Sequence, residues 1–475
     1  MKTPDILLVA VNARYSHASY AIRSLRANLG ALRDRSTLLE TDLEITPIQL
    51  AERIAAQRSR VVGFSIYLWN RPLIEATARI LRHSNPSLIL IAGGPELTPG
   101  YPSGADVQGL WDTVIIGEGE SAFRTCCSHF LDDGTFSETS SEILAKPENL
   151  SELALPYDEY TEEDITQRTI YAETSRGCPC SCTYCTSDST TFRLFPLDPL
   201  LASFESLWKR GVRQFKFLDR TFNASVRHAC AVLNFFLPRV TPDTCLHFEI
   251  NPSHLHEELL TRMAAFPKGA LHLEVGMQTL NPEVSQRIGR KGDPAIALEN
   301  LRKLCHETGA IVHADLIFGL PGEDEASFAK GFDTLVATSG APEVQVNWLK
   351  GLPGTRLFHE AGQQRLAFNP EPPYELIHSD VLSFDDLCRI QRFARCWELV
   401  HNRGKFPEEV RALHAAISPH YYQGYMALME HIYATEGKFY AIKPAKLQAY
   451  LHEHLACLSL KFINHRELRG TEENG

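Results

Sequence analysis

Short apolar runs alternate with amphipathic stretches through the first 140 residues. The apolar runs at 6–11, 61–68, 88–92 and 114–116 predict buried strands, and the stretches 20–29 and 72–83 have helical spacing. Continuous apolar strands separated by helices indicate a parallel sheet that is covered on both faces. We therefore predict an α/β fold in which residues 1–140 form a Rossmann-like, doubly wound domain. Ligands of such a sheet bind at the carboxyl ends of its strands.

Two further blocks follow. Residues 141–168 are polar and contain Pro147 and Pro156, so we expect a linker there. Between 169 and 375 the chain again alternates strands and helices, which predicts a partial or full (β/α) barrel with its active site at the strand carboxyl ends. From 376 to 475 the strand signals vanish, which predicts a small α-helical C-terminal domain. The expected barrel strands cover residues 170–173, 214–218, 246–250, 271–275, 312–318 and 344–349.

Composition narrows the possible functions. The 475 residues are enough for about two to four domains. The net charge of −11, from 58 acidic and 47 basic side chains, disfavours a nucleic-acid partner. No apolar run approaches the roughly 18 uncharged residues that a membrane span needs. The first apolar run, residues 6–11, is also too short for a signal peptide. We expect a cytoplasmic protein without a membrane span.

Cysteine spacing supplies the first chemical signal. Of the twelve cysteines, Cys178, Cys182 and Cys185 form a C-x3-C-x2-C pattern. Thiolates are the natural ligands of iron–sulfur clusters, and three of them leave one iron of a four-iron cluster open for reaction. The same spacing is compatible with a structural zinc site that takes Cys180 or a distant residue as fourth ligand.

With Tyr184 before its last cysteine, the pattern reads C-x3-C-x-aromatic-C and resembles the signature of radical S-adenosylmethionine (radical SAM) enzymes. The resemblance implies that the three cysteines hold a 4Fe-4S cluster and that S-adenosylmethionine chelates its open iron. It also implies reductive cleavage of the sulfonium to methionine and a 5′-deoxyadenosyl radical. The electron would come from an external donor of the flavodoxin or ferredoxin type.

Later strand ends resemble further motifs of this family, in the same order along the chain. The segments 217–223, 274–278, 315–323 and 347–355 stand where the family contacts S-adenosylmethionine, although the usual Gly-Gly-Glu loop is absent. Each segment taken alone is equally compatible with ordinary turn chemistry. The S-adenosylmethionine contacts that the resemblance implies are Tyr184, Asp219, Thr221, Glu274, Gln278, Gly319 and Pro353.

An α/β domain ahead of such a barrel resembles the cobalamin-binding subfamily. The D-x-H-x-x-G motif of some cobalamin domains is absent, and we expect His17 in the corresponding loop to be a surface or helix-start residue. The absence of G-x-G-x-x-G disfavours a dinucleotide; another nucleotide, or no ligand, is the alternative. The cobalamin contacts that the resemblance implies are Ser65, Tyr67, Trp69, Gly93, Gly94, Gly117 and Glu118.

Together these patterns predict a cobalamin-dependent radical SAM enzyme that methylates an unactivated carbon of a small-molecule or peptide substrate. One alternative keeps both cofactors but catalyses an oxidative rearrangement or cyclisation. Another is a non-catalytic module that binds zinc and a corrinoid. A methylthiotransferase is disfavoured, because that family needs three N-terminal cluster cysteines and only Cys126 and Cys127 precede the linker.

Overall fold

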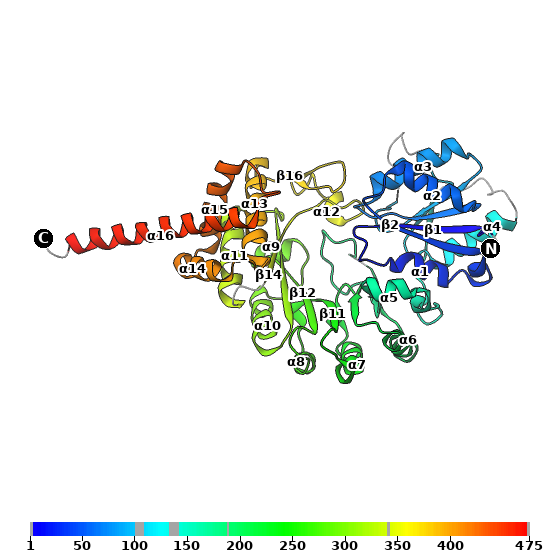
Figure 1. The fold of residues 1–475 in the computed structure, drawn as a ribbon, viewed down its shortest axis with the longest axis horizontal. Helices are drawn as coiled ribbons and strands as arrows, with labels where there is room; N and C mark the ends of the chain where they lie inside the picture. The colour runs from blue at the N-terminus through cyan, green and yellow to red at the C-terminus, as the bar shows by residue number, and fades with distance from the viewer. Residues whose placement is uncertain (1–2, 100–108, 133–141, 188–189, 340–342, 473–475) are drawn as a thin grey trace.

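The computed structural model describes residues 3–99, 109–132, 142–187, 190–339 and 343–472, with the backbone alone for 460–472. Three parts follow one another from the N-terminus to the C-terminus (Figure 1). A parallel α/β layer lies at one end, an arc of strands and helices lies in the middle, and a helical part lies at the other end. The predicted fold class is confirmed.

The first part is built on a six-stranded sheet in the order β2-β1-β3-β4-β5-β6, and every pair of neighbours is parallel. The strands are β1 (Ile6–Asn12), β2 (Ser36–Asp42), β3 (Val61–Ser65), β4 (Ile89–Gly93), β5 (Thr113–Ile116) and β6 (Glu142–Leu144). The helices are α1 (Tyr20–Ala27), η1 (Gly30–Arg35), α2 (Pro47–Gln57), α3 (Arg71–Ser84) and α4 (Glu120–Asp132).

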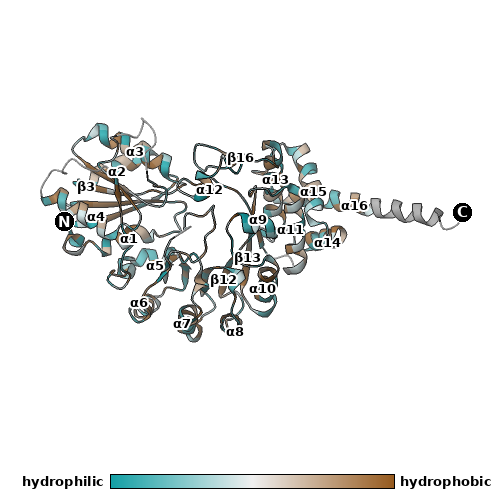
Figure 2. Ribbon diagram, turned by 180° about the vertical axis from the view of Figure 1, so that it is seen from behind, coloured by the Kyte–Doolittle hydropathy of each residue, from teal (hydrophilic) through white to brown (hydrophobic). Residues whose placement is uncertain are grey.

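Helices cover both faces of this sheet, as a doubly wound fold requires. Leu7 and Val9 of β1 belong to a core that includes residues of α2 and α3, whereas Leu8 belongs to a second core that includes residues of α1 and α4. Figure 2 shows the same arrangement as hydrophobic colour along the strands of this sheet. The carboxyl ends of the strands face the middle part of the molecule (Figure 1).

The sequence pattern predicted the inner strands β1, β3, β4 and β5 but neither edge strand. β2 has two adjacent leucines among polar residues, and only Ser36 and Leu39 are buried. β6 has no buried residue. Edge strands of a parallel sheet are partly solvated, so they lack the continuous apolar run of inner strands. The residue limits predicted for the domains stay a prediction, and β6 falls within the segment expected to be a linker.

The second part is an open barrel of six parallel strands in the order β14-β13-β12-β11-β10-β7. Within the described residues, the outer strands β7 and β14 do not pair with each other, so the barrel is partial. The sheet strands are β7 (Ile170–Ala172), β10 (Gln214–Phe217), β11 (Cys245–Ile250), β12 (Leu271–Gln278), β13 (Ile311–Phe318) and β14 (Glu343–Trp348).

Helices cover the outside of this arc (Figure 1). They are α6 (Leu197–Lys209), α7 (Val226–Phe236), α8 (Glu257–Ala264), α10 (Pro294–Glu307) and α11 (Glu325–Ser339), whereas the short α9 (Pro282–Arg287) lies at the carboxyl ends of the strands. Short elements complete this part, namely β8 (Ser175–Arg176), β9 (Arg193–Leu194), η3 (Phe222–Ala224), η4 (Leu237–Arg239), η5 (Pro252–His254), α12 (Arg356–His359), β15 (Ala367–Phe368) and β16 (Leu376–His378).

Two short helices join the first part to the barrel, η2 (Pro156–Glu159) and α5 (Glu162–Gln167). Tyr157 and Tyr160 are buried in one core together with Tyr20 of α1 and the apolar residues of the barrel. Because this core is continuous across the boundary, the two parts are packed against each other rather than tethered.

The C-terminal helices extend the barrel core beyond β14. They are α13 (Phe384–Trp397), the π-helical turn η6 (Glu398–Asn402), α14 (Pro407–Ile417), α15 (Tyr421–Glu436) and α16 (Pro444–Glu472). The amide of Asn402 donates to the Val344 carbonyl (2.9 Å) and accepts from the Val344 amide (3.2 Å), which satisfies part of the free edge of β14. Among the described residues, no helix has the length and apolarity of a membrane span.

Candidate functional site

The three spaced cysteines lie in a loop, residues 177–187, that begins directly after β8 at the carboxyl end of the barrel. Gly177 starts it with φ +78°, and a Cβ there would lie 2.2 Å from the Thr191 carbonyl oxygen, so only glycine fits. The Thr183 amide donates to the Ile288 carbonyl (2.9 Å). The loop is therefore held at its start and at its middle.

Each of the three thiols has its own surroundings. Cys178 Sγ lies 3.3 Å from the hydroxyl of Thr221, Cys185 Sγ accepts from the Ser187 amide (3.4 Å), and Cys182 is buried, which raises its pKa. No three His, Cys, Asp or Glu side chains in the described ranges gather around a single metal position. Cysteines of a four-iron cluster each bind a different iron, so one loop that carries three thiols beside a cavity can hold such a cluster.

Beside these thiols lies a cavity of about 290 Å³ at the mouth of the barrel. Of the residues predicted to contact S-adenosylmethionine, four line it: Tyr184, Thr221, Glu274 and Gln278. Four charged residues that the sequence analysis did not single out line it as well: Arg220, Glu249, Arg290 and Asp315. Glu249 and Asp315 carried a signal, since each is a carboxylate inside a strand whose other residues are apolar apart from a histidine two positions before it.

Charged side chains of both signs line this cavity. Burial raises the pKa of Glu249 to about 7, and burial together with the neighbouring Glu274 raises that of Asp315 to about 7. Asp315 is 9% exposed, and its Oδ1 has no hydrogen-bond partner among the described residues. Arg290 donates to the Gly276 carbonyl. These carboxylates and this guanidinium fit the ammonium, sulfonium and carboxylate groups of S-adenosylmethionine.

Three of the predicted contacts lie elsewhere. Asp219 is buried next to the cavity, where its carboxylate accepts from the Thr174 amide (3.0 Å) and from the hydroxyls of Thr174 and Ser175 (2.5 Å each). Gly319 packs against leucine side chains behind the sheet. Pro353 lines a different pocket, at the face of the first domain. The roles assigned to these residues stay predictions.

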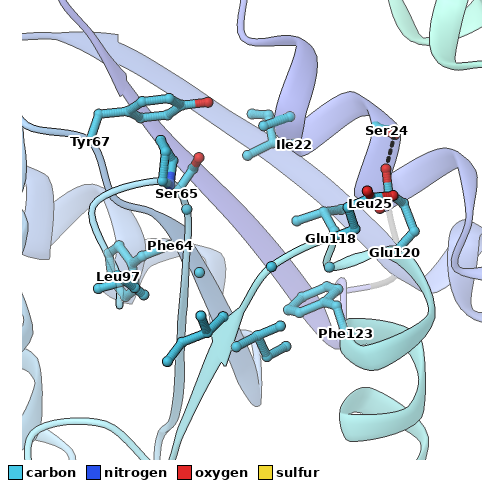
Figure 3. Close-up of a pocket in the computed structure, with 18 of the residues that line it drawn as sticks. Ile22, Ser24, Leu25, Phe64, Ser65, Tyr67, Leu97, Glu118, Glu120 and Phe123 are labelled. Carbon is cyan, nitrogen blue, oxygen red and sulfur yellow. Dashed lines mark hydrogen bonds between the residues drawn. The ribbon is translucent and has the colours of Figure 1, made fainter. Parts of the chain in front are cut away.

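A second and larger pocket, of about 510 Å³, lies between the first domain and the barrel. Figure 3 shows how its side chains converge, with Ile22 and Leu25 from α1, Phe123 from α4 and Ser65 at the end of β3. Its apolar depth and polar mouth suit a ligand with an aromatic tail and an amide-rich rim, as cobalamin has. The predicted cobalamin contacts that line it are Ser65, Tyr67, Gly93, Gly94, Gly117 and Glu118.

Gly94 shapes one wall of this pocket through its backbone. It adopts φ +122°, and a Cβ would lie 2.3 Å from the Ile66 carbonyl oxygen and 2.7 Å from the Ile66 nitrogen. Gly93 has no such constraint, because its nearest atom would be the Ile115 carbonyl oxygen at 3.8 Å. Gly94, one of the predicted cobalamin contacts, therefore also lets two loops cross.

Trp69 and His17 lie outside this pocket. Trp69 is 46% exposed, stacks on Tyr67 with ring centroids 4.5 Å apart, and donates from its indole to the Val11 carbonyl (3.2 Å). Trp69 therefore supports Tyr67, which does line the pocket. His17 packs edge-on against Tyr171.

An ion-pair network joins the two domains at the pocket mouth. Arg176, next to the cysteine loop, pairs with Glu118 (3.0 Å), Glu120 (2.7 Å) and Glu173 (3.1 Å). Burial, opposed by Arg176, raises the pKa of Glu173 to about 7. Glu118 is thus held by protein cations, including Arg193.

Comparison with known families agrees with this geometry. Residues 6–126 match the model of the B12 binding domain, and residues 172–335 match the model of the radical SAM superfamily. Residues 363–465 match a protein family of unknown function, DUF4080. The first two matches confirm the predicted cofactors: a 4Fe-4S cluster, S-adenosylmethionine and cobalamin.

Relatives of known name match more than half of this chain. The 2-(S-pantetheinyl)-carbapenam-3-carboxylate methyltransferase of Streptantibioticus cattleyicolor is 26% identical over 60% of this chain and 46% of its own length. The cobalamin-dependent radical SAM methyltransferase TokK of Streptomyces tokunonensis is 25% identical over 62% of this chain and 48% of its own. The matched regions therefore span about half the length of these relatives.

The solved structures agree on the fold. The cobalamin-dependent S-adenosylmethionine radical enzyme OxsB, with aqua-cobalamin bound, superposes with a TM-score of 0.63 at 13% identity, over 98% of this chain and 80% of that chain. The likeness in fold extends over nearly the whole chain. With its B12-binding domain, its open barrel and its cysteine loop, this chain belongs to the cobalamin-binding members of the radical SAM superfamily.

Proposed function

We propose that this chain is a cobalamin-dependent radical SAM methyltransferase that places a methyl group on an unactivated carbon of a small-molecule or peptide substrate. The observation that carries the proposal is the contact between the two cavities, which share the side chain of Arg220 in their walls. A substrate at that junction faces both cofactor sites at once. The names of the relatives, which include two methyltransferases, support this reaction class.

The residues of the chain bind and orient the groups that react. When bound, S-adenosylmethionine on the cluster supplies hydrogen-atom abstraction and cobalamin supplies the methyl group. Cys178, Cys182 and Cys185 would hold the cluster. Arg290 and Asp315 would hold the charged ends of S-adenosylmethionine. The apolar pocket walls exclude water, which protects reactive species from side reactions.

The same proposal includes an external electron donor of the flavodoxin or ferredoxin type, because a cluster of this kind must be reduced before each cleavage. The loop that carries the cysteines is only partly buried: Cys178 and Cys185 retain some exposure. A reducing compartment, the cytoplasm, would protect such a cluster from oxygen.

The test is anaerobic reconstitution with iron, sulfide and hydroxocobalamin, followed by incubation with S-adenosylmethionine and a low-potential reductant. Formation of 5′-deoxyadenosine shows the radical half of the reaction. Each methyl transfer must also convert one S-adenosylmethionine to S-adenosylhomocysteine, while the product gains one methyl group. A product without added methyl, formed with 5′-deoxyadenosine alone, would assign a rearrangement or cyclisation instead.

A further inference from the structure

Arginine side chains line both cavities, and they differ in what they contact. Arg176, which lines the larger pocket, forms ion pairs with three carboxylates. Arg290, in the smaller cavity, donates to the Gly276 carbonyl. Arg220 lines both cavities and is exposed, and its guanidinium forms no hydrogen bond or ion pair with any residue that the structure describes.

Arg220 is nevertheless held at a fixed place in the backbone. Asp219 before it is anchored by Thr174 and Ser175, and Thr221 after it donates from its hydroxyl to the Arg220 carbonyl (2.7 Å). The guanidinium is thus a cation on a rigid support at the carboxyl end of β10. A rigid support reduces the entropy lost on binding, which favours a recognition role over a chance surface charge.

The charge of Arg220 acts on both sides of the junction. Burial raises the pKa of Tyr67 in the larger pocket and that of Glu249 in the smaller cavity, and the positive charge of Arg220 partly lowers both. Glu249 is too far away to form an ion pair with it among the contacts of the structure. The guanidinium therefore lies between the two cofactor sites with its donors free.

Resting on the proposed function, we infer that Arg220 anchors the methyl-accepting substrate and that this substrate carries an oxyanion, a carboxylate or a phosphate, close to the carbon that reacts. A guanidinium presents paired N–H donors that match the two oxygens of such a group. The other cavity arginines already have partners, and the charge of Arg290 acts on Cys182, where S-adenosylmethionine would bring its own carboxylate.

The first test asks whether Arg220 stays free once the cofactors are bound. The holoenzyme, with cluster, cobalamin and S-adenosylmethionine, is treated anaerobically with phenylglyoxal, with and without inorganic phosphate or acetate, and modified arginines are mapped by peptide mass. We expect Arg220 to react, and either anion to slow its modification at least threefold. Arg227, an exposed arginine on α7, is the control and should react at the same rate throughout.

Two outcomes of this labelling would overturn the inference. If S-adenosylmethionine or cobalamin alone protects Arg220, then the residue belongs to a cofactor site. If Arg220 reacts but neither phosphate nor acetate slows it more than they slow Arg227, then the junction does not bind oxyanions. Neither outcome depends on turnover, so both differ from a failure of the proposed methyl transfer.

The second test identifies the substrate chemistry directly. The holoenzyme is incubated with a metabolite extract and S-adenosylmethionine that carries a 13C-labelled methyl group, and labelled products are separated by anion exchange. We expect an anionic product, and its formula shows whether phosphorus is present. We also expect Arg220→Gln to raise its apparent KM by about ten- to a hundredfold, Arg220→Lys to raise it less, and Arg227→Gln to leave it unchanged.

A labelled product that is neutral or cationic would overturn the inference while supporting the methyltransferase. The absence of any labelled product, despite formation of 5′-deoxyadenosine, would instead contradict the proposed methyl transfer, and the phenylglyoxal experiment would still decide whether Arg220 binds an oxyanion.

Discussion

Four cysteine side chains lie in the loop from Cys178 to Cys185, and three of them have the spacing of cluster ligands. We expect Cys182→Ala to leave little iron on the protein and to abolish cleavage of S-adenosylmethionine, because an alanine cannot ligate iron. The reconstituted wild-type chain should carry about four iron and four sulfide ions. Iron and sulfide analysis, together with measurement of 5′-deoxyadenosine, checks both expectations.

Cys180 provides the matched control in the same loop. Its sulfur accepts a hydrogen bond from Asn251 (3.2 Å), so it has a protein partner. Cys180→Ala should therefore retain the cluster and most of the cleavage activity. Equal iron loss in both variants would mean that Cys180 is itself a ligand, and zinc in place of iron would revive the alternative of a structural metal site.

A pH effect is expected from Glu323, a buried residue in the turn after β13. Burial raises its pKa from 4.5 to about 7, and its Oε1 accepts from the Thr279 hydroxyl (2.6 Å). Between pH 4.5 and about 7, the Glu323 carboxyl loses its proton in the unfolded chain but keeps it in the folded chain. The stability that the protonated Glu323 gives the folded state is therefore fully present below about pH 4.5. As the pH rises to 7, the free energy of unfolding falls by about 3 kcal/mol.

Glu323→Gln should remove this slope, since the amide keeps an acceptor for Thr279 but cannot ionise. Urea unfolding at pH 5, 6 and 7 gives the free energy of unfolding of the wild type and of the variant. The difference between these two free energies is the readout, because the effects of other titrating groups cancel in it. A difference that is constant over this range would show that Glu323 is ionised in the folded state.

The candidate site could be predicted from sequence where its residues are neighbours in the chain. The three cysteines share one loop, so their spacing alone revealed them. Arg220, Glu249 and Asp315 come together only because the strands β10 to β13 lie side by side in one sheet and end at the same edge. No local pattern encodes this arrangement of strands. Asp219 shows the opposite case: the sequence motif predicted that it contacts S-adenosylmethionine, but its carboxylate is buried and binds Thr174 and Ser175 instead.

Among the elements, the crossing of the loops after β3 and β4 should be the most sensitive to a single methyl group. Gly94→Ala places a Cβ against the backbone of Ile66 at a φ that alanine rarely adopts. We expect a loss of at least about 2 kcal/mol in the free energy of unfolding, together with weaker cobalamin binding. Denaturant unfolding and a cobalamin titration followed by absorbance measure the two effects.

Gly93→Ala is the adjacent control. Its Cβ would meet only the Ile115 carbonyl oxygen at an ordinary distance, so its stability should change by less than about 0.5 kcal/mol. If cobalamin binding nevertheless weakens in Gly93→Ala, then that glycine serves the ligand rather than the fold. Equal stability of both variants would contradict the role given to Gly94.

At the level of elements, the hydrophobic pattern predicted the strands of the first sheet that are buried on both faces and missed the strands that are partly exposed. β1, β3, β4 and β5 are continuous apolar runs with helices on either side. β2 and β6 lie at the two edges, where about half or more of each strand is partly exposed. Their pairing is determined by the neighbouring strand rather than by their own sequence, so the periodicity of the chain could not reveal them.

The whole molecule works only if the two domains keep their cavities in contact, and buried ion pairs contribute to that contact. Arg23 of α1 pairs with Glu40 of β2 (2.6 Å) and with Asp164 of α5 (2.7 Å), and all three side chains are less than 10% exposed. Arg168 supports the same carboxylates at 3.2 and 3.5 Å. The cluster ties the first sheet to the helices that lead into the barrel.

Arg23→Met keeps the length of the side chain but leaves Arg168 as the only cation that pairs with the two buried carboxylates among the described residues. Removing one partner of a buried pair costs about 3 kcal/mol or more. We expect that loss in the free energy of unfolding, together with faster proteolysis between residues 145 and 170. We also expect 5′-deoxyadenosine to form without S-adenosylhomocysteine, because the two cofactor sites no longer act together. Arg35→Met breaks a half-exposed pair with Asp5 and should cost under about 1 kcal/mol. Unchanged coupling in Arg23→Met would show that the continuous apolar core alone holds the domains together.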